Sequence, residues 1–194
     1  SLSNIEICYH TSEDKIDKSK PVIWICHALT ANSDAEDWWP GMLGRGKLFD
    51  PDKYTLVCAN ILGSCYGTTG ALSINPLTGK PWLNNFPLIT VRDWANAHEL
   101  LRKHLGIEKI YLIAGGSIGG FQSMEWAILQ PHRIENMMLV ATTYMQTPWS
   151  IAINETERMS IEADPTFFNS DPNGGKAGLA AARGLGLLSY RGYE

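Results

Sequence analysis

Residues 109–130 read KIYLIAGGSIGGFQSMEWAILQ, and this stretch decides the fold. Its first six residues form an apolar run typical of a buried strand, and residues 118–130 are typical of a helix that a following proline ends. Between them, Gly115, Ser117 and Gly119 form the pattern G-x-S-x-G. A strand that turns sharply into a helix through this pattern holds the serine hydroxyl out at the end of the strand. We therefore predict that Ser117 is a nucleophile.

The glycines of this pattern have a steric reason. In so tight a turn, a side chain at Gly115 or Gly119 would clash with the neighbouring backbone. The N-terminus of the helix adds partial positive charge beneath the serine. The alternative is a plain glycine-rich turn in which Ser117 only caps the helix. A dinucleotide fingerprint is excluded, because G-x-G-x-x-G cannot be laid on GGSIGG.

A similar pattern lies further upstream. Residues 63–67 read GSCYG, which has the form G-x-C-x-G and also follows a strand-like run. Glycines and prolines between residues 68 and 81 exclude a helix after it. Cys65 is therefore interpreted as structural or as lining a pocket.

Outward from the decisive stretch, strands and helices alternate. Apolar runs predict strands at residues 21–29, 54–62, 109–114 and 136–142, with an earlier edge strand at residues 5–10. A helix is predicted over residues 90–105, where Thr90 can cap the N-terminus with Asp93 three residues on. This alternation indicates an α/β fold, with a mostly parallel sheet and helices on both faces.

The character of the chain changes after residue 142. Residues 148–163 and 176–188 look helical, with no strand between them. We predict an α/β core over residues 1–145 and the start of a helical cap over residues 146–194.

Composition limits the partners. The 194 residues are 44% hydrophobic and 19% charged, which is typical of a globular domain. A net charge of −4 argues against nucleic acid or an anionic membrane as partner. No run approaches the roughly 18 apolar residues of a membrane span, and no signal peptide is visible. The four cysteines form no CxxC pair, so we expect no metal site and a reduced, cytoplasmic protein.

Acyl transfer also needs two donors for the oxygen that becomes negative. In the strand–turn–helix setting, one donor is the N–H after the nucleophile, here Ile118. The other comes from the loop after an earlier strand, where Leu29 is the candidate. His27 stands beside it. We interpret His27 as a buried histidine that orders this loop, because a general base is expected after the serine in the chain.

The chain resembles the homoserine O-acetyltransferase family, which has the α/β-hydrolase fold. The resemblance covers nearly the whole sequence. It rests on HALTAN (residues 27–32), ANILGSCYGTTG (59–70), the dipeptide at 81–82, GGSIGGFQSMEWA (115–127), QPHR (130–133) and GLAAARGLGLLSYR (178–191).

The resemblance implies a ping-pong reaction. Ser117 would take the acetyl group from acetyl-CoA, and the hydroxyl of L-homoserine would then receive it, on the route to methionine. Acetyl-CoA is a substrate here, and no cofactor is implied. Arg183 and Tyr190 match an arginine and a tyrosine that lie near the amino acid in the family; the alternative for Arg183 is a solvated charge on a cap helix. Relatives are often dimers, so a homodimer is possible.

The chain also departs from the family. The triad aspartate and histidine of relatives lie beyond the cap helices, so we expect them to be absent from these 194 residues, which would be an N-terminal fragment of low activity. Three other interpretations stay open. They are a succinyltransferase or serine acetyltransferase of the same family, an esterase or lipase, and a non-catalytic binding module.

Overall fold

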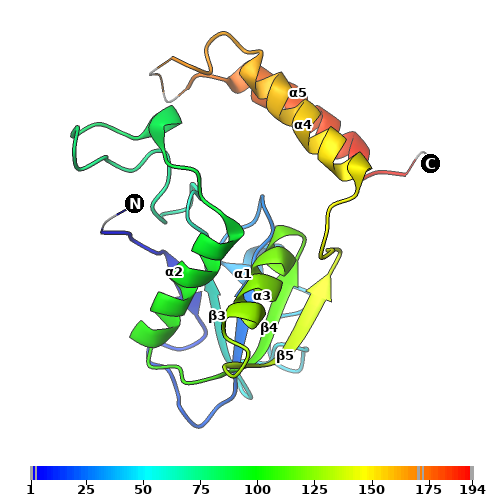
Figure 1. Cartoon of the computed structure of the whole chain (residues 1–194). Coiled ribbons are helices and arrows are strands. Elements are labelled where there is room, and N and C mark those ends of the chain that lie inside the picture. Colours follow the sequence, from blue (N-terminus) through cyan, green and yellow to red (C-terminus); the bar gives the residue numbers. More distant parts are fainter. Residues whose placement is uncertain (1, 3, 170, 172, 193–194) are drawn as a thin grey trace. The chain divides into compact units, whose positions relative to one another are not determined.

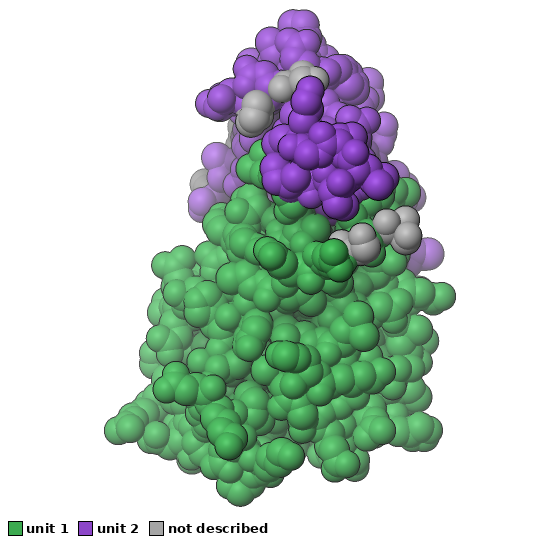
Figure 2. Space-filling view, turned by 90° about the vertical axis from the view of Figure 1, so that its left-hand side faces the viewer, with its two compact units in different colours: residues 1–73, 87–144 green, residues 74–86, 145–194 purple. Residues whose placement is uncertain are grey.

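The computed structural model describes residues 2, 4–169, 171 and 173–192. Contacts divide the chain into two compact units, which Figure 2 colours separately. Unit 1 comprises residues 1–73 and 87–144, and unit 2 comprises residues 74–86 and 145–194. Residues 74–86, which lie within the range 1–145 predicted as the α/β core, are grouped with unit 2.

Unit 1 is built on a five-stranded sheet with the order β1-β3-β2-β4-β5. Its strands are β1 (Tyr9–Thr11), β2 (Val22–Cys26), β3 (Thr55–Ala59), β4 (Ile110–Gly116) and β5 (Ile134–Val140). β1 pairs with β3 antiparallel, and the other three pairings are parallel. The mostly parallel sheet predicted from the alternation is confirmed.

Helices cover both faces of this sheet, as predicted. α2 (Val91–His104) and α3 (Ile118–Leu129) stand side by side over one face in Figure 1. On that face Trp24 of β2 meets Trp126 of α3 edge-on, with ring centroids 5.0 Å apart, and both rings are fully buried. The short α1 (Ala35–Trp38) packs with the core of the other face, where Phe49 is fully buried.

The predicted start of α2 is confirmed in detail. The Thr90 hydroxyl accepts the N–H of Asp93 at 3.3 Å, and the Asp93 carboxylate accepts the N–H of Thr90 at 2.8 Å. This reciprocal capping satisfies two of the donors that every helix N-terminus leaves unpaired.

The first strand begins later than its apolar run predicts. The N–H groups of Glu6 and Cys8 donate to the hydroxyls of Thr69 and Thr68, at 2.8 and 2.9 Å. Side chains of a loop therefore take the place of a strand ladder at these residues. Regular pairing begins only at Tyr9.

A buried polar network joins α2 and α3 to the end of β3. His98 is fully buried; its Nδ1 accepts a hydrogen bond from Gln122 at 2.8 Å, and its Nε2 lies 3.3 Å from the carbonyl oxygen of Asn60. The Asn60 amide in turn donates to the Ser33 hydroxyl and to the carbonyl of Tyr66, each at 2.8 Å. Burial lowers the pKa of His98 to about 4, so this imidazole is neutral in the folded protein.

Unit 2 contains η1 (Leu83–Asn85), α4 (Pro148–Glu162) and α5 (Lys176–Ser189). A methyl group at Gly178 would lie 2.5 Å from the carbonyl oxygen of Ser160, so the two long helices approach each other closely there. Asp164 accepts the N–H groups of Ala177 and Gly178, each at 3.0 Å, and so caps α5. Among the described residues, no helix has the length and apolar character needed to cross a bilayer.

The His98 site predicts a pH dependence of stability. In the unfolded chain the His98 imidazole binds a proton below the ordinary histidine pKa of 6.5, whereas in the folded protein it does so only below about pH 4. The contribution of His98 to the unfolding free energy should therefore be constant above pH 6.5 and fall by about 3 kcal/mol between pH 6.5 and pH 4.

Denaturant unfolding across this range, compared with His98→Gln, checks the prediction. The variant should lose stability at every pH but show a flatter dependence below pH 6.5. His132→Gln, at an exposed histidine, is the matched control. Parallel pH profiles for the parent protein and His98→Gln would contradict the assignment.

Candidate active site

The chain reverses direction sharply at Ser117, between β4 and α3. Its backbone has φ of 54° and ψ of −121°, a region that residues with a side chain rarely adopt. Such a conformation costs on the order of 1–3 kcal/mol and persists only where its surroundings enforce it. Ser117 is half-buried, so its hydroxyl is not sealed in the interior. The predicted turn from strand to helix is confirmed.

Steric crowding explains the glycines on either side. A methyl group at Gly119 would lie 2.8 Å from the carbonyl oxygen of His27 and closer still to that of Cys26. A methyl group at Gly115 would overlap the carbonyl oxygen of Gly119. The start of α3 is therefore packed directly against the end of β2, and only glycine permits that approach.

Two hydrogen bonds anchor the peptide groups of Ser117, one to the last residue of β5 and one from a residue just beyond it. The Ser117 N–H donates to the carbonyl of Val140 at 3.1 Å. The hydroxyl of Thr142 donates to the carbonyl of Ser117 at 2.8 Å. No local sequence pattern identifies these partners, because their position beside Ser117 follows from the register of β5 against β4, which only the structure shows.

The sheet register brings the predicted oxyanion donors to the same edge as the serine. Cys26 of β2 lies opposite Gly115 of β4, so the loop that contains Leu29 and the turn at Ser117 leave the sheet side by side. The N–H groups of Leu29 and Ile118 donate to no other group in the described part of the chain. Both amides are thus free for a ligand, and their oxyanion role stays a prediction.

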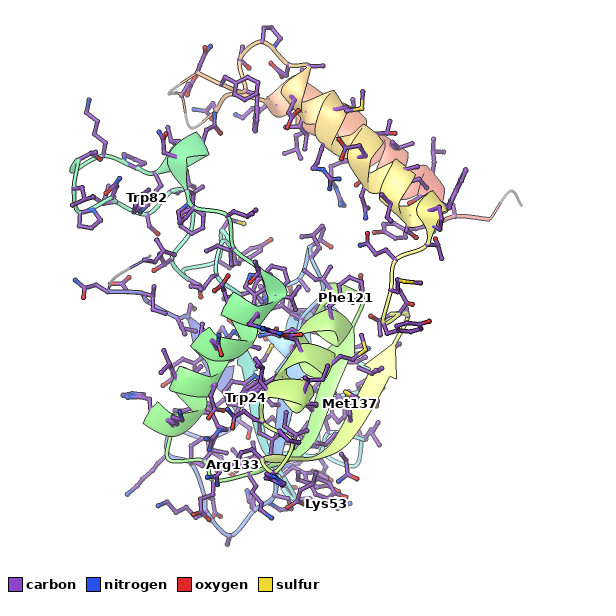
Figure 3. The ribbon with its side chains drawn as sticks, in the orientation of Figure 1. Trp24, Lys53, Trp82, Phe121, Arg133 and Met137 are labelled. Atoms are coloured by element: carbon purple, nitrogen blue, oxygen red, sulfur yellow. The ribbon has the colours of Figure 1, made fainter. Side chains whose placement is uncertain are left out.

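Figure 3 shows which edge this is. Phe121, in the first turn of α3, lies at one end of the sheet. Lys53 and Arg133, which precede β3 and β5, lie at the opposite end. Ser117 therefore stands at the carboxyl ends of the parallel strands, where open α/β sheets bind their ligands.

His27 has the structural role expected for it. The imidazole is 1% exposed, and its Nε2 accepts the N–H of Ile61 at 3.2 Å. The proton is therefore on Nδ1, which donates to the carbonyl of Ala28 at 2.8 Å. Burial lowers the pKa of His27, so the neutral ring ties the end of β3 to the loop that contains Leu29.

The other histidines are not hydrogen-bonded to Ser117. His10 bonds to the Ser33 hydroxyl at 2.9 Å, His98 is enclosed in its own network, and His104 and His132 are exposed. None of the five histidines hydrogen-bonds to Ser117. No group of three metal-ligating side chains is found in the residues that the structure describes.

The cysteines differ in exposure. Burial raises the pKa of the Cys26 thiol to about 12, so this thiol beneath the turn is unreactive. Cys65 is exposed and lines a cavity of about 230 Å³ formed within its own loop. No helix begins between Cys65 and residue 82, so GSCYG does not open a strand–turn–helix motif, as predicted.

Arg183 and Tyr190 belong to unit 2. Arg183 lies on α5, and Tyr190 ends that helix seven residues later, so the two lie on about the same side of it. Both side chains are exposed. The structure thus places Ser117, Ile118 and the loop that contains Leu29 at the same end of the sheet in unit 1, whereas the two predicted acceptor-binding residues belong to unit 2.

A half-buried serine in a strained turn between strand and helix, at the carboxyl edge of a parallel sheet, defines a class of protein. The family described as "alpha/beta hydrolase fold" matches residues 21–182, and the chain belongs to it. Within this class, the chain is 49% identical to the homoserine O-acetyltransferase of Cyclobacterium marinum, over 93% of the chain and 52% of that protein. It is 39% identical to the homoserine O-acetyltransferase of Nostoc punctiforme, over 100% of the chain and 55% of that protein.

Solved structures of an acetyltransferase and of an esterase are also similar to this chain. The homoserine O-acetyltransferase from Bacillus anthracis is similar with a TM-score of 0.85 and 28% identity, over 95% of this chain and 54% of that one. Esterase E22 is similar with a TM-score of 0.86 and 29% identity, over 95% and 55% of the two chains. The chain spans about half the length of the curated relatives it matches.

The crowding at the turn yields a matched pair of variants. Gly119→Ala should cost about 1–3 kcal/mol of stability or more, because the new methyl must push the backbone at Cys26 and His27 aside. Gly116→Ala should cost less than about 1 kcal/mol, since a methyl group there meets only the carbonyl oxygen of Val140, at 3.7 Å. Chemical denaturation of both variants measures the difference, and equal costs would contradict this account of the turn.

Proposed function

We propose that this chain carries the nucleophile of a homoserine O-acetyltransferase. The full-length protein would move the acetyl group of acetyl-CoA to the hydroxyl of L-homoserine, forming O-acetyl-L-homoserine and CoA for methionine biosynthesis. The single observation that carries the proposal is the strained, half-buried Ser117 in a chain 49% identical to a protein of that name.

The first half-reaction is acylation of the serine. Ser117 Oγ attacks the thioester carbon as its proton leaves to a base, and the oxygen of the tetrahedral intermediate takes the negative charge. The free N–H groups of Leu29 and Ile118 would donate to that oxygen; losing one such donor typically costs about 3 kcal/mol of barrier. The C–S bond then breaks, and CoA leaves as the protonated thiol.

The second half-reaction transfers the acyl group from Ser117 to homoserine. The hydroxyl of homoserine attacks the Ser117 ester, a base takes the hydroxyl proton, and the serine regains a proton as it leaves. Arg183 would hold the carboxylate of homoserine, because a planar guanidinium can donate two parallel hydrogen bonds to a carboxylate. Tyr190, the residue that caps the C-terminus of α5, would lie near the bound homoserine.

The base is proposed to lie outside these 194 residues. All five histidines of the chain are engaged elsewhere or exposed away from the turn, so a histidine with its aspartate would come from another part of the protein. We accordingly expect the 194 residues alone to turn over slowly or not at all. We propose further that the enzyme is cytoplasmic, needs no cofactor and forms a homodimer.

A serine esterase is the second candidate, because esterase E22 is as similar in structure as the acetyltransferase is. The two functions use the same nucleophile and differ in the acceptor, which is water for the esterase.

Thiol release from acetyl-CoA by the full-length protein distinguishes the candidates. We expect release to depend on L-homoserine and to fall at least about 10³-fold in Ser117→Ala, because the nucleophile is lost. Thiol release at the same rate with and without homoserine would contradict the transferase and favour the esterase. Succinyl-CoA and L-serine, tested in the same assay, report on the donor and the acceptor. Full activity of Ser117→Ala would overturn the nucleophile itself.

The acceptor site has its own test. Arg183→Ala should raise the KM for homoserine about tenfold or more, while the rate of thiol release without acceptor stays unchanged, because the guanidinium contacts only the second substrate. Arg158→Ala is a suitable control, since its charge lies on α4 and is paired with Glu155 on the same helix. An unchanged KM in Arg183→Ala would leave this residue as a solvated surface charge.

A further inference from the structure

The last residue of β5 and the residues just after it contact the nucleophile turn in three ways. Val140 accepts the N–H of Ser117 at 3.1 Å, Thr142 donates to its carbonyl at 2.8 Å, and Thr142 also packs against Gly120. A methyl group at Gly120 would lie 2.6 Å from the Cβ of Thr142, so the threonine fills the space that this glycine leaves open.

The backbone between these two partners is itself unusual. Ala141 has φ of 48°, another positive value at a residue with a side chain. This conformation ends β5 at Val140 and carries the chain so that the hydroxyl of Thr142 reaches back to Ser117. Ser117 and Ala141 thus both adopt a costly conformation, and they lie on the two segments that these hydrogen bonds join. Such strain persists only where the surrounding structure enforces it, so the contact is a fixed feature of the fold.

The bonds act on the dihedral angles of Ser117 directly. The N–H donated to Val140 belongs to the peptide before the residue, and the carbonyl that accepts from Thr142 belongs to the peptide after it. Holding both peptide planes leaves φ and ψ of the serine little freedom. The carbonyl also accepts the N–H of Gly120 at 3.0 Å, so it makes two bonds in this orientation.

We propose that Thr142 is a positioning residue for the nucleophile, and that its hydroxyl holds the peptide after Ser117 in the orientation that presents Oγ. It does not touch the reacting atoms. Its catalytic consequence rests on the proposed acyl transfer, whereas its effect on the backbone of residue 117 does not.

The first experiment measures backbone strain without any activity. In the full-length protein, Ser117→Gly should melt about 2–4 °C above Ser117→Ala, because glycine tolerates the positive φ and alanine does not. Adding Thr142→Val, which keeps the shape but removes the hydroxyl, should reduce this gap to less than half as the backbone relaxes. Adding Thr142→Ser, which keeps the hydroxyl, should preserve the gap.

The second experiment measures catalysis. Thr142→Val should lower kcat for acetyl transfer about tenfold with the KM for acetyl-CoA changed less than about twofold, because a displaced nucleophile loses rate and not binding. Thr142→Ser should recover kcat to within about threefold of the parent. A purely structural role would lower the stability of both variants and leave kcat of the folded enzyme unchanged.

The outcomes separate the two proposals. A melting gap that Thr142→Val leaves intact overturns the positioning role, and so does an unchanged kcat in that variant. Absence of acetyl transfer in the unsubstituted protein overturns the proposed function alone, and the melting gap then decides the role of Thr142 by itself.

Discussion

The strained backbone of one residue is the constraint on which the rest of this structure depends. Ser117 stays in its costly conformation because glycine on either side lets β2, β4 and α3 approach, and because hydrogen bonds hold both adjoining peptides. Each such bond contributes about 1 kcal/mol, which is comparable with the cost of the strain it opposes. One such bond alone does not offset the strain at the upper end of that range, so the turn depends on several neighbours at once.

Those neighbours come together through the parallel register of the sheet. β2, β4 and β5 end level with one another, with Cys26 opposite Gly115 and Gly116 opposite Val140. The loops that leave these strands are distant in sequence, yet they emerge at one edge. A buried neutral histidine, His27, then joins the loop after β2 to the end of β3. The candidate site is thus a consequence of strand order more than of any single motif.

The main strands and helices and the turn at Ser117 could be predicted from the sequence, whereas the contacts that hold the turn could not. Apolar runs and caps located β2, β4, α2 and α3, and G-x-S-x-G located the turn, because these signals are local. The contact between Thr142 and Ser117 joins residues 25 positions apart and depends on register, which a single sequence does not encode visibly. The edge strand was placed too early because the threonine side chains that cap residues 6 and 8 come from about sixty residues away.

Unit 2 combines residues 74–86 with residues 145–194, and the Asn84 side chain donates to the carbonyl of Phe167, 83 positions later. During synthesis, the earlier segment leaves the ribosome long before its partner exists. The contact that joins the two segments can therefore form only after the intervening residues 87–144 have been made. The order of translation therefore makes the completion of this unit a late step, dependent on a contact of long sequence separation.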